Sequence, residues 1–410
     1  MSGRHAGYLV TLAMLVIGSP LAAQESVFNL PAFGLPASGE SVRARGLGGA
    51  GVGLGGEDFT LENPARLSAF ERAGLFISVL GQRTTIDNGA IEGEFEDVVF
   101  PVAQIVVPAW NGIAFGVGYY QFVDFDAAIE DEVSFGSDTL PVTLASEGAV
   151  AVLAPAVGAT LADGTRVGVS ADVYLGSREI IRSLDVSDVV TGAVATADSL
   201  SRDFGAVGLT LGVERDFNER LTVGGSYKIR PTLTSQITAA PGEGLEGSKS
   251  DFVLPNEWIV GASYWVRPSL LVSGVVRSSD WSSFEGDVLG GSVGGFESTV
   301  EWGAGLEFRP LRSHAMVLGP TAPARIGFRH RSLPIRVGGE QVSEWSASLG
   351  YGRGFAGQRS GFDVVFEFGR RGAIDQNEIE ESFVRLGFGF NVFEQWEARG
   401  GGRGRGRGGN

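Results

Sequence analysis

The chain has 410 residues, a formal net charge of −16, 63 Gly, 26 Phe and no Cys. The lack of Cys excludes disulfide scaffolds, thiolate metal sites and cysteine nucleophiles, and three His leave little capacity for metal binding or general-base catalysis. The acidic balance argues against nucleic acid as a partner. Apolar residues make up 43% of the chain, yet after the first residues no run is long enough for a membrane-spanning helix.

Residues 1–23 are predicted to be a signal peptide. Arg4 precedes an apolar run over residues 8–17, and Ala22 and Ala23 supply small residues for cleavage. The run is too short to cross a bilayer as a helix. A buried N-terminal helix is the alternative, and it is less well supported because no amphipathic face interrupts the run. We expect cleavage after Ala23, so that the mature chain starts at Gln24.

Residues 24–70 do not alternate and are predicted to form a segment distinct from the strands that follow. They hold a glycine-dense stretch, residues 45–56, and then Asn-Pro-Ala. Such a segment is either an exposed tail or a plug inside a barrel, and its apolar residues favour the plug. Glycines there would let the backbone pass close to a barrel wall. The Asn-Pro pair would set the turn from the plug into the wall, and a simple loop before the first strand is the alternative for this pair. The plug residues singled out are Gly46, Gly48, Gly49, Gly51, Asn63, Pro64 and Ala65.

Residues 71–397 carry the strongest signal, which is period-two alternation repeated many times. Residues 382–396, for example, alternate Val384, Leu386 and Phe388 with Arg385 and Gly387. A strand sends successive side chains to opposite faces, and segments of ten to fifteen residues suit tilted membrane crossing. The sequence therefore predicts an all-β fold, a transmembrane antiparallel β-barrel of about 14 strands. We place the strands near 73–84, 98–109, 112–125, 147–162, 165–182, 203–216, 220–236, 252–266, 269–281, 298–309, 323–333, 343–354, 360–370 and 382–396.

The connections between these strands alternate in length. Asn111-Gly112 and Asp163-Gly164 are tight-hairpin dipeptides. Long polar connections are expected at 85–97, 126–146, 183–202, 237–251, 282–297 and 371–381. Residues 310–322 do not fit this alternation, because a short turn is expected at this position and the stretch is longer than that. Short turns in the periplasm and long loops outside are the rule for outer-membrane barrels, so both termini are predicted to be periplasmic. Residues 398–410 are an Arg/Gly tail and are predicted to be disordered.

Three sequence motifs resemble those of the FadL-type transporters of hydrophobic compounds. The first is the Gly-rich stretch at 45–51 that leads to Asn63-Pro64-Ala65; the second is Leu254–Trp258 followed by Asp280–Phe284; the third is Ala324–Phe328 followed by Leu333-Pro334. The motifs occur in the expected order over most of the chain. The resemblance implies a fourteen-stranded barrel in which movement of the plug opens a route for the substrate. The PorV-type barrels, accessory proteins of a secretion system, share the Gly-rich and Asn-Pro-Ala elements and are the near alternative.

Two sets of residues are candidates for ligand contact. Apolar residues of the expected loop 126–146, notably Phe135 and Leu140, would capture a hydrophobic ligand if exposed, or would pack the loop onto its neighbours. Arginines on the expected lumen face, Arg325, Arg329 and Arg385, would hold a carboxylate of a fatty acid. The alternative for the arginines is an ion-pair lattice across the lumen that holds the wall rigid.

No Ser–His pair or other catalytic constellation is found, so we expect no enzymatic activity, no cofactor and no metal site. The hypothesis from the sequence is passive uptake of small hydrophobic compounds, long-chain fatty acids or aromatic hydrocarbons, gated by the plug. The rival hypothesis is a non-transporting barrel that anchors or assists secreted proteins. Expected partners are outer-membrane lipid and lipopolysaccharide, a hydrophobic small-molecule ligand, and the barrel-assembly machinery. A general diffusion porin is disfavoured because the lumen is predicted to be glycine-rich and plugged.

Overall fold

The computed structural model describes residues 26–29, 33–89, 92–135, 138–184, 196–239, 247–284, 296–309, 322–355 and 360–394. The predicted signal peptide, the Arg/Gly tail and most of the irregular connection 310–322 lie outside the described residues. No helix among the residues described is long and apolar enough to cross a membrane.

The chain is almost entirely β-structure with a few short helices. The helical elements are η1 (Val27–Asn29), α2 (Val42–Arg45), η2 (Pro64–Ala69), η3 (Trp281–Ser283) and α3 (Ile374–Asn377). The strands of the first half are β1 (Leu35–Pro36), β2 (Ala73–Asp87), β3 (Glu92–Val99), β4 (Val102–Pro108), β5 (Ile113–Asp124), β6 (Ala127–Phe135), β7 (Asp138–Thr160), β8 (Arg166–Leu184) and β9 (Thr196–Asp216). Those of the second half are β10 (Leu221–Ile229), β11 (Thr232–Ala239), β12 (Lys249–Val253), β13 (Glu257–Arg267), β14 (Leu270–Ser279), β15 (Thr299–Phe308), β16 (Ala324–Val337), β17 (Glu340–Phe355), β18 (Ser360–Gly372) and β19 (Glu380–Glu394).

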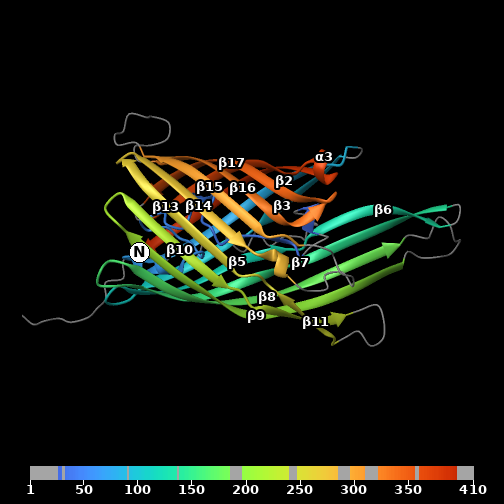
Figure 1. Cartoon of the computed structure of the whole chain (residues 1–410), viewed down its shortest axis with the longest axis horizontal. Helices are drawn as coiled ribbons and strands as arrows, with labels where there is room; N and C mark the ends of the chain where they lie inside the picture. Colours follow the sequence, from blue (N-terminus) through green and yellow to red (C-terminus); the bar gives the residue numbers. More distant parts are fainter. Residues whose placement is uncertain are drawn as a thin grey trace, which may run out of the picture.

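The strands β2 to β19 form a closed antiparallel barrel of 14 strands, as predicted (Figure 1). Four of these barrel strands are each interrupted once, and so consist of two consecutive elements: β3 with β4, β5 with β6, β10 with β11, and β12 with β13. The ring closes where β19 pairs with β2, from Glu380 opposite Asp87 to Glu394 opposite Ala73. Each predicted strand corresponds to one barrel strand in the same order.

The outer face of the barrel is apolar because the sequence alternates. On β19, Val384, Leu386 and Phe388 are exposed outward, whereas Arg385 is buried on the lumen side. The same pattern recurs around the ring, for example at Leu306 on β15 and Ile326 on β16. Such an outward apolar band is the surface that a barrel presents to lipid.

Several connections predicted to be long loops are shorter than expected, because the strands continue into them. The expected loop 126–146 is a hairpin in which β6 pairs with β7 from Ala127 opposite Ser146 to Phe135 opposite Asp138. The prediction failed there because acids such as Glu130 and Asp131 interrupt the apolar alternation. Alternation marks a strand that faces lipid on one side, and a hairpin outside the lipid-facing part of the wall need not show it.

The barrel has one tall side and one short side. The strands β7, β8 and β9 contain 23, 19 and 21 residues, whereas β14 and β15 contain 10 each. The tall strands project beyond the others at one end of the barrel (Figure 1). The opposite end carries the tight turns, including Asn111-Gly112, where both residues have positive φ of 55° and 75°. This turn confirms the predicted tight hairpin.

The described N-terminal residues lie inside the barrel, at the end that carries the long hairpins. Ser26 is fully buried and its hydroxyl donates to Glu381, near the start of β19. The chain then runs through the lumen to Ala73 at the opposite end, where β2 begins next to Glu394. The first and last described residues are therefore at opposite ends of the barrel, because the lumen is traversed once, by the described residues between 26 and 70, before the wall begins. That both termini of the chain are periplasmic stays a prediction.

Candidate functional site

The candidate site is the lumen together with the segment that fills it, described residues 26–29 and 33–70, called here the lumen segment. Its α2 turn begins at Ser41, whose hydroxyl accepts from the Ala44 amide at 3.1 Å. Its η2 turn begins at Asn63, whose side-chain oxygen accepts from the Ala65 amide at 3.1 Å. Serine and asparagine satisfy otherwise unpaired amides at such positions. The side-chain amide of Asn63 also donates to the Val213 carbonyl of β9 at 3.0 Å, which ties this turn to the wall.

Glycines allow the lumen segment to lie directly against the wall. A Cβ on Gly303 would overlap the carbonyl oxygen of Gly48, and a Cβ on Gly224 would lie 2.9 Å from the amide nitrogen of Gly53. Wall glycines on many strands make such contacts. We call nine of them, one from each of nine strands, the glycine band: Gly116, Gly158, Gly168, Gly212, Gly224, Gly261, Gly303, Gly327 and Gly350. Because no side chain fits there, the band fixes the height and path of the lumen segment.

Three of the four glycines singled out in the glycine-dense stretch lie against the wall. Gly46 faces Gly350, Gly48 lies against β15 and β16, and Gly49, with φ of +83°, packs on the guanidinium group of Arg329. Gly51 instead faces the methyl group of Ala44 within the lumen segment. That these glycines take part in gating stays a prediction.

Five charged residues of the lumen segment form ion pairs with five different wall strands. Glu40 pairs with Arg329 at 2.7 Å, Arg43 with Glu307 at 2.9 Å and Arg45 with Glu367 at 3.0 Å. Glu62 pairs with Arg277, and Arg66 with Glu214. All of these side chains are largely withdrawn from solvent. Breaking one such pair leaves an uncompensated charge, so the pairs hold the lumen segment in a single position.

An aromatic cluster occupies the lumen toward the end with the long hairpins. The Phe33 ring of the lumen segment is buried among four others, with centroid distances of 5.4 Å to Phe125, 5.7 Å to Phe204, 5.5 Å to Phe252 and 5.8 Å to Phe284. We call these four residues the aromatic box. It is an apolar site, and a side chain of the protein itself fills it.

A second aromatic cluster lies near the opposite end, beside the line where the ring closes. Phe59 and Phe70 of the lumen segment have ring centroids 4.8 Å apart. Phe59 also stacks on Phe76 of β2 at 5.4 Å and lies 5.5 Å from Phe393 of β19. The lumen segment therefore contacts both strands that close the barrel.

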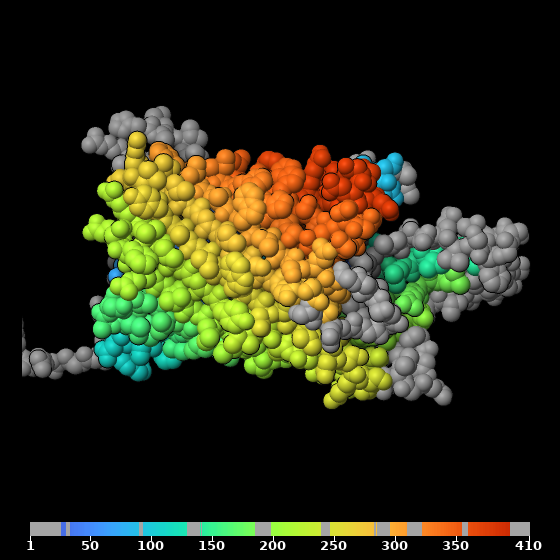
Figure 2. All heavy atoms as spheres, viewed as in Figure 1, coloured from blue at the N-terminus to red at the C-terminus, as the bar shows by residue number. Residues whose placement is uncertain are grey.

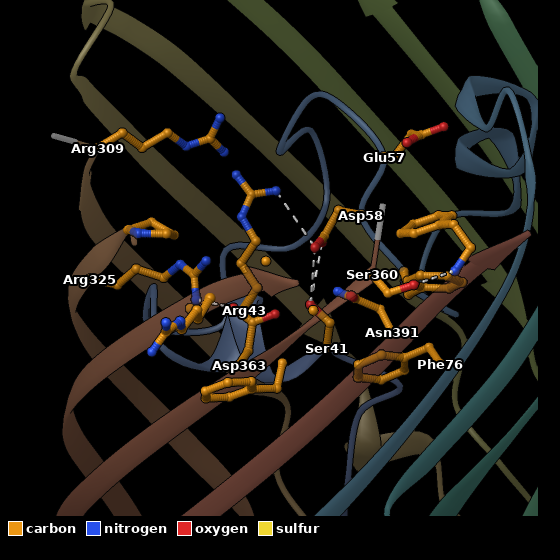
Figure 3. A pocket seen from close by; sticks show the side chains of 18 residues that line it. Ser41, Arg43, Glu57, Asp58, Phe76, Arg309, Arg325, Ser360, Asp363 and Asn391 are labelled. Carbon is orange, nitrogen blue, oxygen red and sulfur yellow. Dashed lines mark hydrogen bonds and ion pairs between the residues drawn. The ribbon is translucent and has the colours of Figure 1, made fainter. Parts of the chain in front are cut away.

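Two polar cavities lie between the lumen segment and the turn end of the barrel. One, of about 280 Å³, is lined by Ser41, Arg43 and Asp58 from the lumen segment and by Arg325 and Asp363 from the wall (Figure 3). The other, of about 670 Å³, shares Arg43 and Arg309 with the first. In the first cavity the charges are already paired, because Arg325 contacts Glu307 at 2.7 Å and Asp363 at 2.5 Å.

The other predicted ligand residues are placed as follows. Arg329 is paired with Glu40, and the Arg385 side chain donates to Gln82 and lies 3.6 Å from Glu367, so all three arginines belong to the ion-pair lattice. Leu140 lies on β7 and is buried, which corresponds to the packing alternative rather than to an exposed capture surface. Phe135 ends β6, and its side chain lies outside what the structure describes.

Sequence reasoning missed the ion pairs of the charged residues of the lumen segment, and it used Phe33 only as one of the apolar residues that favour a plug. Glu40 and Arg329 are 289 positions apart, and no periodicity links a coil residue to a strand so distant. A usable signal was nevertheless present. The lumen segment has both signs of charge interspersed with glycine, and the predicted lumen face of the strands has both signs as well.

The chain was compared with known families and structures. A family model described as BamG matches residues 8–400. No curated protein matches the chain. Among solved structures, a Pseudomonas aeruginosa FadL homologue superposes with a TM-score of 0.60 at 13% identity, covering 88% of this chain and 99% of that chain.

Two further solved structures are similar over the whole barrel. The Ralstonia pickettii toluene transporter TbuX has a TM-score of 0.56 at 17% identity, covering 90% of this chain and 100% of that chain. The Pseudomonas putida toluene transporter TodX has a TM-score of 0.57 at 13% identity, with coverages of 90% and 100%. At these identities the likeness establishes a shared FadL-type barrel fold, and function has to be argued from the site.

Proposed function

This chain belongs to the BamG family, and on that premise and on its FadL-type fold we propose that it is an outer-membrane barrel that takes up small hydrophobic compounds. In this proposal residues 71–397 are the wall, and residues 24–70 are a gate that must shift before a ligand passes. The observation that carries the proposal is the aromatic box, an apolar site of four phenylalanines occupied by Phe33. The solved transporters of toluene with the same fold support it.

The chemistry of the box favours an aromatic hydrocarbon over a fatty acid. Rings of the box meet Phe33 edge-on and tilted, the arrangements that aromatic pairs prefer. The arginines proposed for a carboxylate, Arg325 among them, already have carboxylate partners in the lattice. A fatty acid would have to displace one of these partners, whereas an aromatic ring needs only the place of Phe33.

The test is to measure which small molecules the detergent-purified full-length chain retains, by mass spectrometry, followed by competition between labelled toluene and a fluorescent fatty acid. We expect the chain to bind toluene in a displaceable manner. We also expect proteoliposomes that contain the Phe33→Ala variant to take up toluene faster than those with the unaltered chain. A protein that retains and binds neither compound would refute the proposal. Deletion of residues 24–62 should change uptake while the barrel still assembles, and unchanged uptake would refute gating by this segment.

A second candidate function is an accessory role in barrel assembly without transport. Membership of the BamG family points to it, and so does the firm seating of the lumen segment by ion pairs to five wall strands. A barrel kept closed in this way would serve as a scaffold for other envelope proteins. Crosslinking in intact cells would discriminate the two functions. If the chain is a scaffold, crosslinking should recover a stable protein complex, and the purified chain should hold no bound hydrocarbon.

A further inference from the structure

A smaller polar cavity lies in the lumen toward the end with the long hairpins, next to the aromatic box. Its volume is about 50 Å³. Residues of the wall strands and of η3 that line it include Arg230, Glu257, Arg277, Trp281 and Glu301. Trp281 is buried, and its ring centroid lies 5.5 Å from that of Phe284 in the aromatic box. The cavity and the box therefore adjoin through these two rings.

The lumen segment closes this cavity on the side away from the wall. Pro36 and Ala37 line it, three and four positions after Phe33, which fills the aromatic box. A shift of this stretch that empties the box would therefore also open the cavity. The strands β13, β14 and β15 form a continuous outer face (Figure 2), so a ligand would reach the cavity along the lumen and not through this part of the wall.

Several buried polar atoms of the residues that line this cavity make no hydrogen bond within the described part of the chain. The Nη2 of Arg230 donates to Glu257 at 2.9 Å, whereas its Nε and Nη1 have no partner. The Nε of Arg277 and the Oε1 of Glu301 have none either, and these two atoms are 3.9 Å apart. Buried donors and acceptors without partners destabilise a protein. The cavity is therefore suited to a polar group that supplies the missing hydrogen bonds.

The charges around the cavity decide which polar group fits. A carboxylate would lie close to the carboxylates of Glu257 and Glu301, and a plain hydrocarbon would leave the N–H groups of the two arginines unpaired. A hydroxyl group can both accept and donate. Its oxygen, placed between Arg277 Nε and Glu301 Oε1, would accept from the first and donate to the second. We propose that this cavity is a subsite for the hydroxyl group of a phenol, whose ring lies beside Trp281 in place of Pro36 and Ala37.

This inference rests on the proposed uptake function and names the class of aromatic ligand more closely. The test is calorimetric titration of the full-length chain in detergent with four compounds that differ in one ring substituent: toluene, 4-methylanisole, 4-methylphenol and 4-methylbenzoate. We expect 4-methylphenol to bind about tenfold more tightly than toluene, because it gains hydrogen bonds to charged groups. 4-Methylanisole accepts but cannot donate and should lie between them. 4-Methylbenzoate should bind most weakly.

Two variants assign the preference to this cavity. Glu301→Leu removes the acceptor, and Arg230→Lys removes the planar set of donors while it keeps the charge that faces Glu257. In each variant 4-methylphenol should bind within about twofold of toluene, and the affinity for toluene should not change. The matched controls, Glu94→Leu and Arg215→Lys, make the same kinds of change at exposed side chains of β3 and β9. They should keep the preference of the unaltered chain.

The outcomes separate this inference from the function on which it rests. Binding of toluene without a preference for 4-methylphenol would overturn the inference alone, and would mean that the cavity holds ordered water only. Tightest binding of 4-methylbenzoate would overturn it in favour of an anion site. A preference that survives in both Glu301→Leu and Arg230→Lys would show that the hydroxyl group binds elsewhere. Binding of none of the four compounds would overturn the inference and the uptake function together.

Discussion

The lumen segment is held by two different kinds of contact at two levels of the barrel. At the middle level, ion pairs and the glycine band join it to the wall through charges and main-chain atoms. Toward the long hairpins, Phe33 packs into the aromatic box, beside the pairing of β1 with β5 and the hydrogen bond from Ser26 to Glu381. Charged and main-chain contacts depend on exact geometry and tolerate no substitute, whereas an apolar site accepts any molecule of suitable size. We therefore expect the middle level to fix the lumen segment, and the aromatic box to be the place where a ligand ring can replace the Phe33 ring.

The largest effect is expected from a charge at the middle level. Arg277→Leu removes the partner of buried Glu62, and an uncompensated buried charge costs about 3–5 kcal/mol. Hydrogen exchange of the lumen segment should show an opening free energy lowered by that amount. The control, Arg370→Leu, removes an exposed partner of Glu380 and should cost less than about 1 kcal/mol. Similar values for both would mean that the ion pairs do not hold the segment.

The next effect concerns the aromatic box. Phe33→Ala removes a buried ring and should lower the opening free energy of residues 33–40 by about 3 kcal/mol. Addition of toluene should restore part of the loss, since an apolar cavity binds a matching ring. Phe217→Ala, at an exposed ring, should change neither quantity. A failure of toluene to protect these amides would contradict the idea that the box is exchangeable.

A smaller effect should follow from filling the glycine band. Gly303→Ala places a Cβ against the main chain of Gly48, and the overpacking should cost about 1–3 kcal/mol in opening free energy. On the neighbouring strand, a Cβ at Gly274 would meet its nearest atom at 3.5 Å, an ordinary contact. Gly274→Ala is therefore the matched control and should leave the lumen segment in place. Limited proteolysis of the segment in both variants would check the difference.

The smallest effect should be that of acid on Glu40. Burial alone would raise the pKa of this carboxyl, but Arg329 and Arg45 hold it below its ordinary value of 4.5. A lowered pKa in the folded state stabilises the seated segment above pH 4.5, and this stabilisation is lost as the pH falls further. Hydrogen exchange of the lumen segment at several pH values below 4.5 would measure this loss, and Glu40→Gln should make it smaller.

The sequence predicted the wall better than its contents, for a physical reason. Lipid on one side and a lumen on the other impose alternation, so a strand such as β19 can be recognised from its own residues. The β6–β7 hairpin carries acids that interrupt such a pattern, and it was predicted as a loop. The pairing of Glu62 with Arg277 depends on where a coil segment lies in the closed barrel, which no local pattern encodes. The glycine-dense stretch was the exception, because glycine itself signals close approach.

The contacts of Phe59 and Phe70 with β2 and β19 bear on the order in which the barrel is built. Other neighbouring strands follow one another in sequence and can form as local hairpins, whereas β19 must find β2 across about 300 residues. The lumen segment is attached directly to β2, and it presents rings that Phe393 of β19 contacts. It thus gives the last strand an apolar surface on which to arrive. The segment that closes the lumen also helps the two ends of the wall to meet.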